Sequence, residues 1–178
     1  MTTKIINMLS GPGSGKSTLA AELFVHMKKE GYRVEYLQEY AKTLVWQEKF
    51  EILNNQHLVS YKYYRLIKAM SGCVDYIILD SSLLNGLWYN RNNPDNLSNV
   101  KKTEKLILKY YHEFENINYY IDRGNLQYET AGRIQTEDES KHIDKDIKSI
   151  LKEYEIEYRN IVIDQDNVMD DLMKSICQ

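Results

Sequence analysis

The chain has few cysteines, few prolines and no long apolar run, and each shortage argues against a class of protein. Its two cysteines, Cys73 and Cys177, lie far apart and form no CxxC motif, which disfavours a disulfide scaffold or a cysteine metal site. Two prolines and eight glycines in 178 residues leave little room for a long linker. No stretch approaches the roughly 20 apolar residues of a membrane span, and the apolar start is too short for a signal peptide. We therefore expect one reduced cytoplasmic domain with no membrane partner.

Positive charge is also in short supply. The 23 Lys and Arg residues are outnumbered by 26 Asp and Glu residues, giving a formal net charge of -3. A large non-specific nucleic-acid footprint needs a strongly basic face, so this balance disfavours one while leaving a local basic groove open. The four histidines show no metal-ligand spacing. A hydrophobic content of 43% is enough for the core of one globular domain.

Apolar patterning predicts strands that alternate with helices. We expect strands at 4–9, 33–39, 74–80, 117–122 and 159–164, and helices at 15–30, 99–115, 136–152 and 167–176. Residues 41–71 are expected to form two helices with a break near Asn54 and Asn55. Thr136 and Glu139 make a T-x-x-E capping box that begins a helix. This alternation predicts an α/β domain with a parallel sheet and helices on both faces, with ligands bound beyond the carboxyl ends of the strands.

The segment LSGPGSGKST, residues 9–18, follows the first strand and matches a G-x-x-x-x-G-K-[ST] phosphate loop, except that Ser10 replaces the opening glycine. Backbone N–H groups of such loops surround phosphates, and the following helix presents its N-terminus to the negative charge. We expect Lys16 to reach the β- and γ-phosphates of ATP and Ser17 to ligate Mg²⁺. Ser10 fits if its backbone angles are ordinary. The residues predicted to bind ATP are Gly11, Pro12, Gly13, Ser14, Gly15, Lys16, Ser17 and Thr18.

Two acids end neighbouring predicted strands. Asp80 closes YIILD, where a carboxylate supports Mg²⁺ directly or through water. Glu39 ends the second strand beside the phosphate loop, where a phosphate acceptor would lie. We expect one acid to serve the metal and the other to bind or deprotonate the acceptor, and the sequence leaves both assignments open. The structural alternatives are a strand-end cap for Asp80 and a surface pair with Lys42 for Glu39.

Further candidates for the acceptor side follow Glu39 along the chain. Tyr40, Gln56 and Arg65 are predicted to contact the acceptor, with Gln56 able to hydrogen-bond a base or an amide. The tyrosines of YKYY, at 61, 63 and 64, are expected to put at least one ring in the core.

The stretch GNLQYETAGRIQ, residues 124–135, has no clear period, and Arg123 and Arg133 bracket it. A structureless run of this length in a compact domain indicates a function. We predict a mobile lid near 123–136 whose arginines reach the transferred phosphate and exclude water, without deciding which arginine makes the contact. The charge run EDESKHIDKDIK that follows is expected to be a solvated helix face.

Four segments, taken in order, resemble a known family. GPGSGKSTLA, EYAKTL, Gln56 with YKYYRLIKA, and IILDSSLL resemble the small P-loop kinases related to the nicotinamide-riboside kinase domain and their phage-encoded relatives. The later stretch YETAGRIQTEDESKHIDKDIKSIL is similar to phage nucleotide-kinase-like proteins, some of which phosphorylate 5-hydroxymethyluridine in DNA. The resemblance implies a single P-loop kinase domain over 1–178, the P-loop NTPase three-layer fold with sheet order 2-3-1-4-5, and the use of ATP and Mg²⁺. Acceptors vary within the family, so none is implied.

Three functions therefore stay open. The first is an ATP- and Mg²⁺-dependent kinase acting on a nucleoside, a nucleotide or a related ribosyl small molecule. The second is a nucleic-acid kinase acting on a 5′ end or on 5-hydroxymethyluridine in DNA, for which Lys101, Lys102, Lys105 and Lys109 supply a basic stretch. The third is a regulatory ATPase, although the sequence shows no second arginine sensor or added helical domain of an AAA+ motor. A monomer or homodimer is expected, in the cytoplasm, or in the host cytoplasm if a phage encodes the chain.

Overall fold

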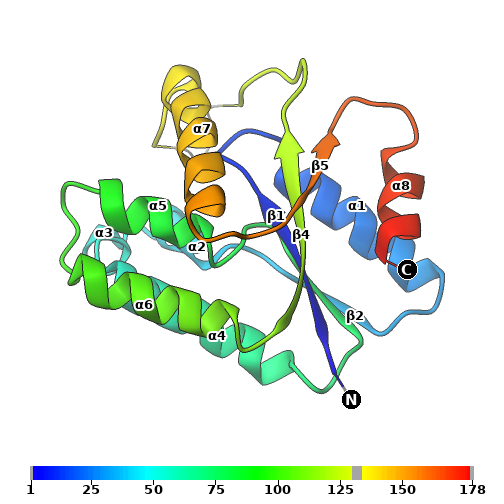
Figure 1. Ribbon diagram of the computed structural model, residues 1–178, viewed down its shortest axis with the longest axis horizontal. Helices are drawn as coiled ribbons and strands as arrows, with labels where there is room; N and C mark the ends of the chain where they lie inside the picture. The colour runs from blue at the N-terminus through cyan, green and yellow to red at the C-terminus, as the bar shows by residue number, and fades with distance from the viewer. Residues whose placement is uncertain (1, 130–133, 177–178) are drawn as a thin grey trace.

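A parallel five-stranded sheet forms the centre of the protein, with strand order β2-β3-β1-β4-β5 (Figure 1). The computed structural model describes residues 2–129 and 134–176. The strands are β1 (Lys4–Leu9), β2 (Val34–Leu37), β3 (Tyr76–Leu79), β4 (Glu115–Asp122) and β5 (Arg159–Val162). The predicted fold class and sheet order are confirmed.

The helices agree with the predicted pattern except in two places. They are α1 (Lys16–Lys29), α2 (Tyr40–Trp46), α3 (Phe50–Leu53), α4 (Gln56–Met70), α5 (Asn85–Asn92), α6 (Val100–Tyr111), α7 (Glu137–Glu153) and α8 (Val168–Ile176). The 41–71 region forms three helices rather than two. Helix α5 was not predicted because its asparagines and glycine favour helix weakly, and packing of the buried Leu87 stabilises it instead. The predicted break precedes α4, where Asn55 caps the helix by accepting from Leu58 N at 3.0 Å.

The helices form two layers, one on each face of the sheet, and side chains of β1 point alternately to the two layers. Ile6 and Met8 of β1 point to one face of the sheet, where they pack with α1 and α8. Ile5 and Leu9 point to the other face, which α4, α5, α6 and α7 cover (Figure 1). Since all strands are parallel, their carboxyl ends meet at one edge, and the phosphate loop begins there.

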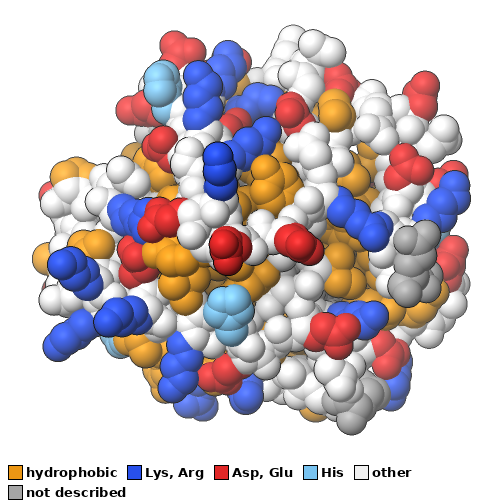
Figure 2. Space-filling model, in the orientation of Figure 1, with side chains coloured by type: hydrophobic (Ala, Val, Ile, Leu, Met, Phe, Trp, Pro, Cys, Tyr) orange, Lys and Arg blue, Asp and Glu red, His pale blue; other side chains and the backbone are white. Residues whose placement is uncertain are grey.

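The surface has lysines along α6, at one end of the molecule (Figure 2). Lys101, Lys102, Lys105 and Lys109 are all exposed, while Thr103, Ile107 and Tyr111 of the same helix face the core. None of the helices within the described residues has both the length and the apolar character needed to cross a membrane.

A polar cluster around Arg91 joins α5, α6 and α7. The Arg91 guanidinium donates to Glu104 of α6 at 2.9 Å and to Glu153 at the end of α7 at 2.7 Å. It also donates to the Tyr154 hydroxyl at 2.8 Å, and that hydroxyl donates to Glu104. The hydrogen bond from Arg91 holds the pKa of Glu104 below its usual range, and burial together with the bond to Glu104 raises the pKa of Tyr154 to about 12. The cluster therefore fixes three helices that cover the same face of the sheet.

We predict that Arg91→Gln lowers the free energy of unfolding by about 1–2 kcal/mol near pH 7, because Glu104 loses its cation in a partly buried position. The Glu104 pKa is depressed in the folded state, so this stabilisation is present above the unfolded pKa of about 4.3 and disappears as the pH falls through the folded value. Urea unfolding of both proteins between pH 3 and pH 7 should give curves that converge at the acid end. Arg33→Gln, which breaks an exposed pair with Asp75, is the control and should change little. A difference in unfolding free energy that does not shrink as the pH falls from 7 to 3 would contradict the assignment.

Candidate active site

The phosphate loop lies between β1 and α1 and is curled by two left-handed glycines. Gly13 has φ 78° and Gly15 has φ 85°, values at which a side chain would strain the backbone. Gly15 also caps the N-terminus of α1. Lys16 is buried and folds over the loop, where its Nζ donates to the Gly11 carbonyl at 2.6 Å and to Ser14 Oγ at 3.4 Å. The loop therefore forms a concave site suited to a phosphate group, and Lys16 lies beside it.

Ser10 fits the opening position of the loop. It is absent from the described non-glycine residues with positive φ, so a side chain is tolerated. Its hydroxyl lies 2.5 Å from Ser14 Oγ, and its carbonyl accepts from Asn85 Nδ2 at 3.3 Å. The substitution adds a hydrogen bond inside the loop.

Asp80 connects three segments at the carboxyl edge of the sheet. Its Oδ2 accepts from Ser17 Oγ at 3.1 Å and from the Tyr36 hydroxyl at 2.9 Å, and its Oδ1 accepts from the Glu39 backbone N–H at 2.6 Å. The carboxylate is almost fully buried, at 2% exposure. A serine hydroxyl next to a carboxylate offers the hard oxygen ligands that Mg²⁺ takes beside a nucleotide, so this pair fits that ion. Tyr36 was not predicted, because only the three-dimensional pairing of β2 with β3 brings it to Asp80.

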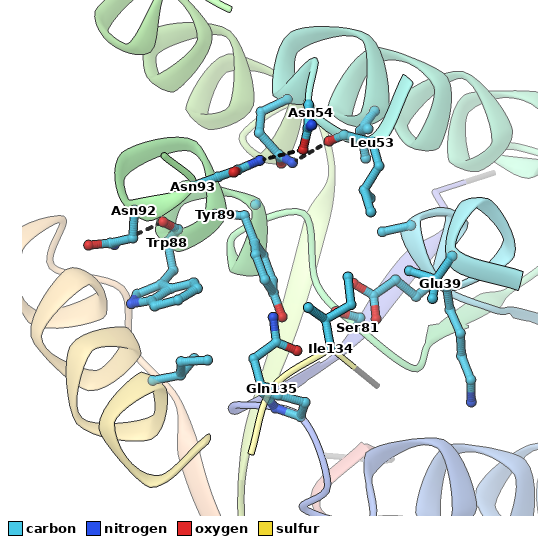
Figure 3. A pocket seen from close by; sticks show the side chains of 18 of the residues that line it. Glu39, Leu53, Asn54, Ser81, Trp88, Tyr89, Asn92, Asn93, Ile134 and Gln135 are labelled. Carbon is cyan, nitrogen blue, oxygen red and sulfur yellow. Dashed lines mark hydrogen bonds between the residues drawn. The ribbon is translucent and has the colours of Figure 1, made fainter. Parts of the chain in front are cut away.

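Glu39 lies next to Asp80 and faces the cavity described below. It is half-buried at the start of α2. Burial is the largest cause that raises the pKa of Glu39, and the nearby Asp80 charge raises it further, while Lys16, a hydrogen bond with Ser81 and Lys42 lower it. Figure 3 shows Glu39 and Ser81 side by side at one end of the cavity. A carboxyl with a raised pKa holds a proton more readily than an exposed one.

A cavity of about 890 Å³ opens beside the phosphate loop (Figure 3). Pro12 and Glu39 line the end next to the loop. One wall comes from α2, α3 and the first turns of α4, and the other comes from α5, residues 92–95, and α7 with the two residues 134–135. Trp88 and Tyr89 contribute a T-shaped pair with ring centroids 5.1 Å apart. Large aromatic and apolar side chains with a few polar groups are typical of sites for small organic molecules.

The charges along the cavity are mostly acidic. Lys42 is the one lysine or arginine among the described lining residues. Glu39, Asp95 and Glu139 supply carboxylates, and His142 lies on the same α7 wall. The walls are otherwise polar through amides, and Asn93 Nδ2 donates to Asn54 Oδ1 at 3.0 Å across the cavity rim (Figure 3).

The predicted acceptor residues have different places. Tyr40 and Gln56 line the cavity, and Gln56 is 4% exposed, with its Nε2 donating to the Leu53 carbonyl at 2.8 Å. Arg65 does not line it, which corrects the expected placement. The reason is helical phase: the cavity takes the α4 face that includes Gln56 and Tyr63, whereas Arg65 lies on the exposed face and donates to the Tyr61 hydroxyl at 3.2 Å.

Among the tyrosines of α4, Tyr63 is in the core, as predicted. Its ring is 5% exposed, and its hydroxyl donates to the Ser81 carbonyl at 2.8 Å. Tyr64 is only partly buried and stacks on Tyr110 of α6, with ring centroids 4.2 Å apart.

Arg123 lies against the phosphate loop, but its charge is already paired. It donates to Asp144 of α7, to Ser140 Oγ at 2.8 Å and to the Pro12 carbonyl at 3.5 Å. Arg133 lies outside the described residues. Asp144 and Ser140 belong to the charge run expected to be solvated, so that expectation is wrong for this face of α7. Ser140 and Asp144 are one helical turn apart, so the sequence indicates that they share a face of α7. It does not indicate that this face packs against the rest of the protein.

Three apolar or aromatic side chains cover the loop glycines. A Cβ built on Gly13 would lie 2.4 Å from the Tyr128 ring, and one on Gly15 would lie 2.4 Å from Ile163 and 2.9 Å from Leu126. The Tyr128 hydroxyl donates to the Gln135 carbonyl at 2.7 Å. Side chains of the stretch between β4 and α7, with Ile163 after β5, therefore pack on the two glycines whose positive φ angles favour glycine.

We predict that Gly13→Ala weakens ADP binding about tenfold or more, because the methyl group meets Tyr128 and the backbone angle is strained. Gly31→Ala is the matched control, since Gly31 has φ 89° and nothing lies within 4 Å of its added Cβ. Both variants should melt at lower temperature than the wild type. Isothermal titration calorimetry should give a larger ADP dissociation constant for Gly13→Ala than for Gly31→Ala. Equal ADP affinities of the two variants would contradict the prediction.

Comparison with solved structures shows the same fold in several kinases. A deoxyadenosine kinase from M. mycoides with dCMP and dCDP bound is 20% identical over 98% of this chain and 99% of that chain, with a TM-score of 0.61. A thymidylate kinase from Ehrlichia chaffeensis is 14% identical over 99% and 100%, with a TM-score of 0.65. An APS kinase from Mycobacterium tuberculosis in complex with AMPPNP and APS is 11% identical over 99% and 96%, with a TM-score of 0.53. At these identities the likeness establishes the fold.

Comparisons at the level of sequence give a family but no specific activity. A search of curated proteins gave no match. The resemblance to nicotinamide-riboside-kinase-like and phage proteins stays a prediction, since neither the family model nor the three structures above bear that group's name. A family model described as an AAA domain matches residues 6–167, which include the phosphate loop, Asp80 and α7. The chain belongs to this AAA domain family and has the fold of P-loop kinases.

Proposed function

We propose that the protein is an ATP- and Mg²⁺-dependent kinase that transfers the γ-phosphate to a hydroxyl of a nucleoside-like small molecule. The observation that carries this proposal is the position of the cavity. Its end is formed by Pro12 of the phosphate loop and by Glu39, so a bound acceptor would lie next to the donor phosphates. In-line transfer requires this adjacency of the two substrates.

Each residue of the site has a distinct part in the proposed reaction. The loop amides hold the donor phosphates, and Lys16 neutralises charge on the oxygens of the transferred group. Ser17 and Asp80 would hold Mg²⁺, which supplies further charge neutralisation when bound. Glu39 is assigned to the acceptor, because Asp80 is committed to Ser17, Tyr36 and the Glu39 amide. Glu39 orients the acceptor hydroxyl and receives its proton as the new P–O bond forms and ADP leaves.

The lining of the cavity supports a nucleoside-like acceptor over other small alcohols. Trp88 and Tyr89 offer aromatic surface to a flat base, and Gln56, Asn54 and Asn93 offer amides for its edge. The neighbours that share the fold include a deoxyadenosine kinase and a thymidylate kinase, which agrees with such an acceptor.

The nucleic-acid alternative has two supports, the resemblance of the stretch YETAGRIQTEDESKHIDKDIKSIL to phage proteins and the exposed lysines of α6. Those lysines are not part of the cavity lining, so they add nothing to the small-molecule site. Incubation with γ-labelled ATP, a nucleoside panel and oligonucleotides distinguishes the possibilities. Label in a free nucleoside supports the proposal, and label confined to DNA supports the alternative. ATP hydrolysis that no acceptor changes would support a regulatory ATPase.

We predict that Glu39→Gln lowers kcat for the acceptor by about a hundredfold or more, because the hydroxyl loses its proton acceptor. The affinity for ADP should stay close to that of the wild type, since Glu39 lies on the acceptor side of the loop. Steady-state kinetics and ADP titration measure the two effects. Glu35→Gln, on β2 four residues before Glu39 and paired with Lys28, is the control. A variant with normal kcat would remove Glu39 from the mechanism.

We also predict a preference between acceptors that differ only in charge. A nucleoside should give a kcat/KM about tenfold or more above that of its 5′-monophosphate, because the described lining offers one lysine against three carboxylates. The comparison uses matched pairs, such as thymidine with thymidine monophosphate, at low ionic strength. Raising the salt concentration should narrow the difference, since screening weakens the repulsion. A monophosphate that is the better substrate would contradict this reading of the cavity.

A further inference from the structure

One face of α7 is hydrogen-bonded to the first residues of the phosphate loop. Asp144 Oδ1 accepts from the Gly11 backbone N–H at 2.7 Å, and the Ser140 hydroxyl donates to the Pro12 carbonyl. A Cβ on Gly11 would lie 2.8 Å from the Ser140 carbonyl and 2.9 Å from Asp144 Oδ1. The helix backbone therefore approaches the loop as closely as glycine allows.

Arg123, which directly follows β4, contacts the same two residues of α7. Two of its nitrogens, Nε and Nη2, donate to Asp144 Oδ2, and Nη2 also reaches Ser140. The Arg123 and Asp144 side chains are 12% and 20% exposed, and Ser140 is fully buried. Tyr120 holds the same turn of α7 by donating to the Asp144 carbonyl at 3.0 Å. Charge-assisted contacts with so little solvent are stronger than surface pairs and define a geometry.

An adjacent face of the same turns lines the acceptor cavity. Its residues there are Glu139, His142 and Ile143, within one turn of Ser140 and Asp144 along the helix. One helical segment thus contacts the phosphate loop with one face and lines the acceptor cavity with the adjacent face. A shift of α7 relative to Gly11 and Pro12 would move the acceptor wall relative to the phosphate by the same amount.

We propose that Asp144 is a positioning residue, which fixes Arg123 and the Gly11 amide and so sets the distance between the phosphate loop and the acceptor wall. This inference rests on the proposed function for the acceptor, although the donor side can be tested without any acceptor. The competing physical effect is simple repulsion, since a carboxylate close to a phosphate site disfavours a nucleotide. The two effects have opposite signs for nucleotide binding.

The test is ADP affinity in Asp144→Asn and Asp144→Ala, by calorimetry. Asparagine can still accept from the Gly11 N–H but no longer balances Arg123, and alanine does neither. Positioning predicts ADP binding weakened about threefold to tenfold in the asparagine variant and more in the alanine variant. Affinity that is unchanged or tighter in the asparagine variant would overturn the proposal. Asp138→Asn, which removes the same charge from an exposed site in the first turn of α7, is the control and should bind ADP as the wild type does.

Two further measurements keep the result interpretable. Melting temperatures are recorded for every variant, because a purely structural role would lower stability and leave ADP affinity in the cold unchanged, which counts against the proposal. Arg123→Lys, which keeps the charge but loses the paired contact, is a second route to the same effect and should raise the KM for ATP in parallel with the ADP dissociation constant. If the wild type binds ADP but phosphorylates no acceptor, the proposed function fails while the Asp144 test still stands.

Discussion

The buried carboxylate of Asp80 is the contact on which the candidate site depends. It ties Ser17 at the start of α1, Tyr36 on β2 and the amide of Glu39 into one cluster. A carboxylate removed from water needs several donors to be stable, and three donors are present here. Because the donors come from three segments, the parallel order of β2, β3 and β1 is a requirement of the site as much as of the fold.

That constraint explains why much of the site could be predicted. A phosphate loop is a local feature, so its glycines, Lys16 and Ser17 are readable from spacing alone. Asp80 and Glu39 end strands, and parallel strands end at one edge, so their meeting follows from topology. The sheet order itself was implied by the family resemblance, and the strand pairing confirms that order.

The features that escaped prediction depend on which side of a helix faces inward. Arg65 and Tyr63 are two residues apart on α4, yet one is exposed and the other buried. Asp144 belongs to a run of charged residues that is typical of a solvated helix face, and only the three-dimensional structure shows that it contacts Gly11. Helix α5 escaped because tertiary contacts outweigh its weak propensity. In each case the deciding contact joins residues far apart in the sequence.

The two cations beside the phosphate loop, Arg123 and Lys16, have different kinds of partner. Arg123 brings a cation to the loop, and Asp144 cancels it, so the unliganded loop does not leave that arginine buried without a counterion. Lys16 instead donates hydrogen bonds to the Gly11 carbonyl and the Ser14 hydroxyl, which are neutral groups, and its charge lowers the pKa of nearby Glu39. A neutral partner gives up a lysine to phosphate more readily than a carboxylate gives up an arginine, because the ion pair has the stronger attraction. In the proposed transfer, Lys16 is therefore the group suited to follow the phosphate, and Arg123 is the group suited to stay fixed.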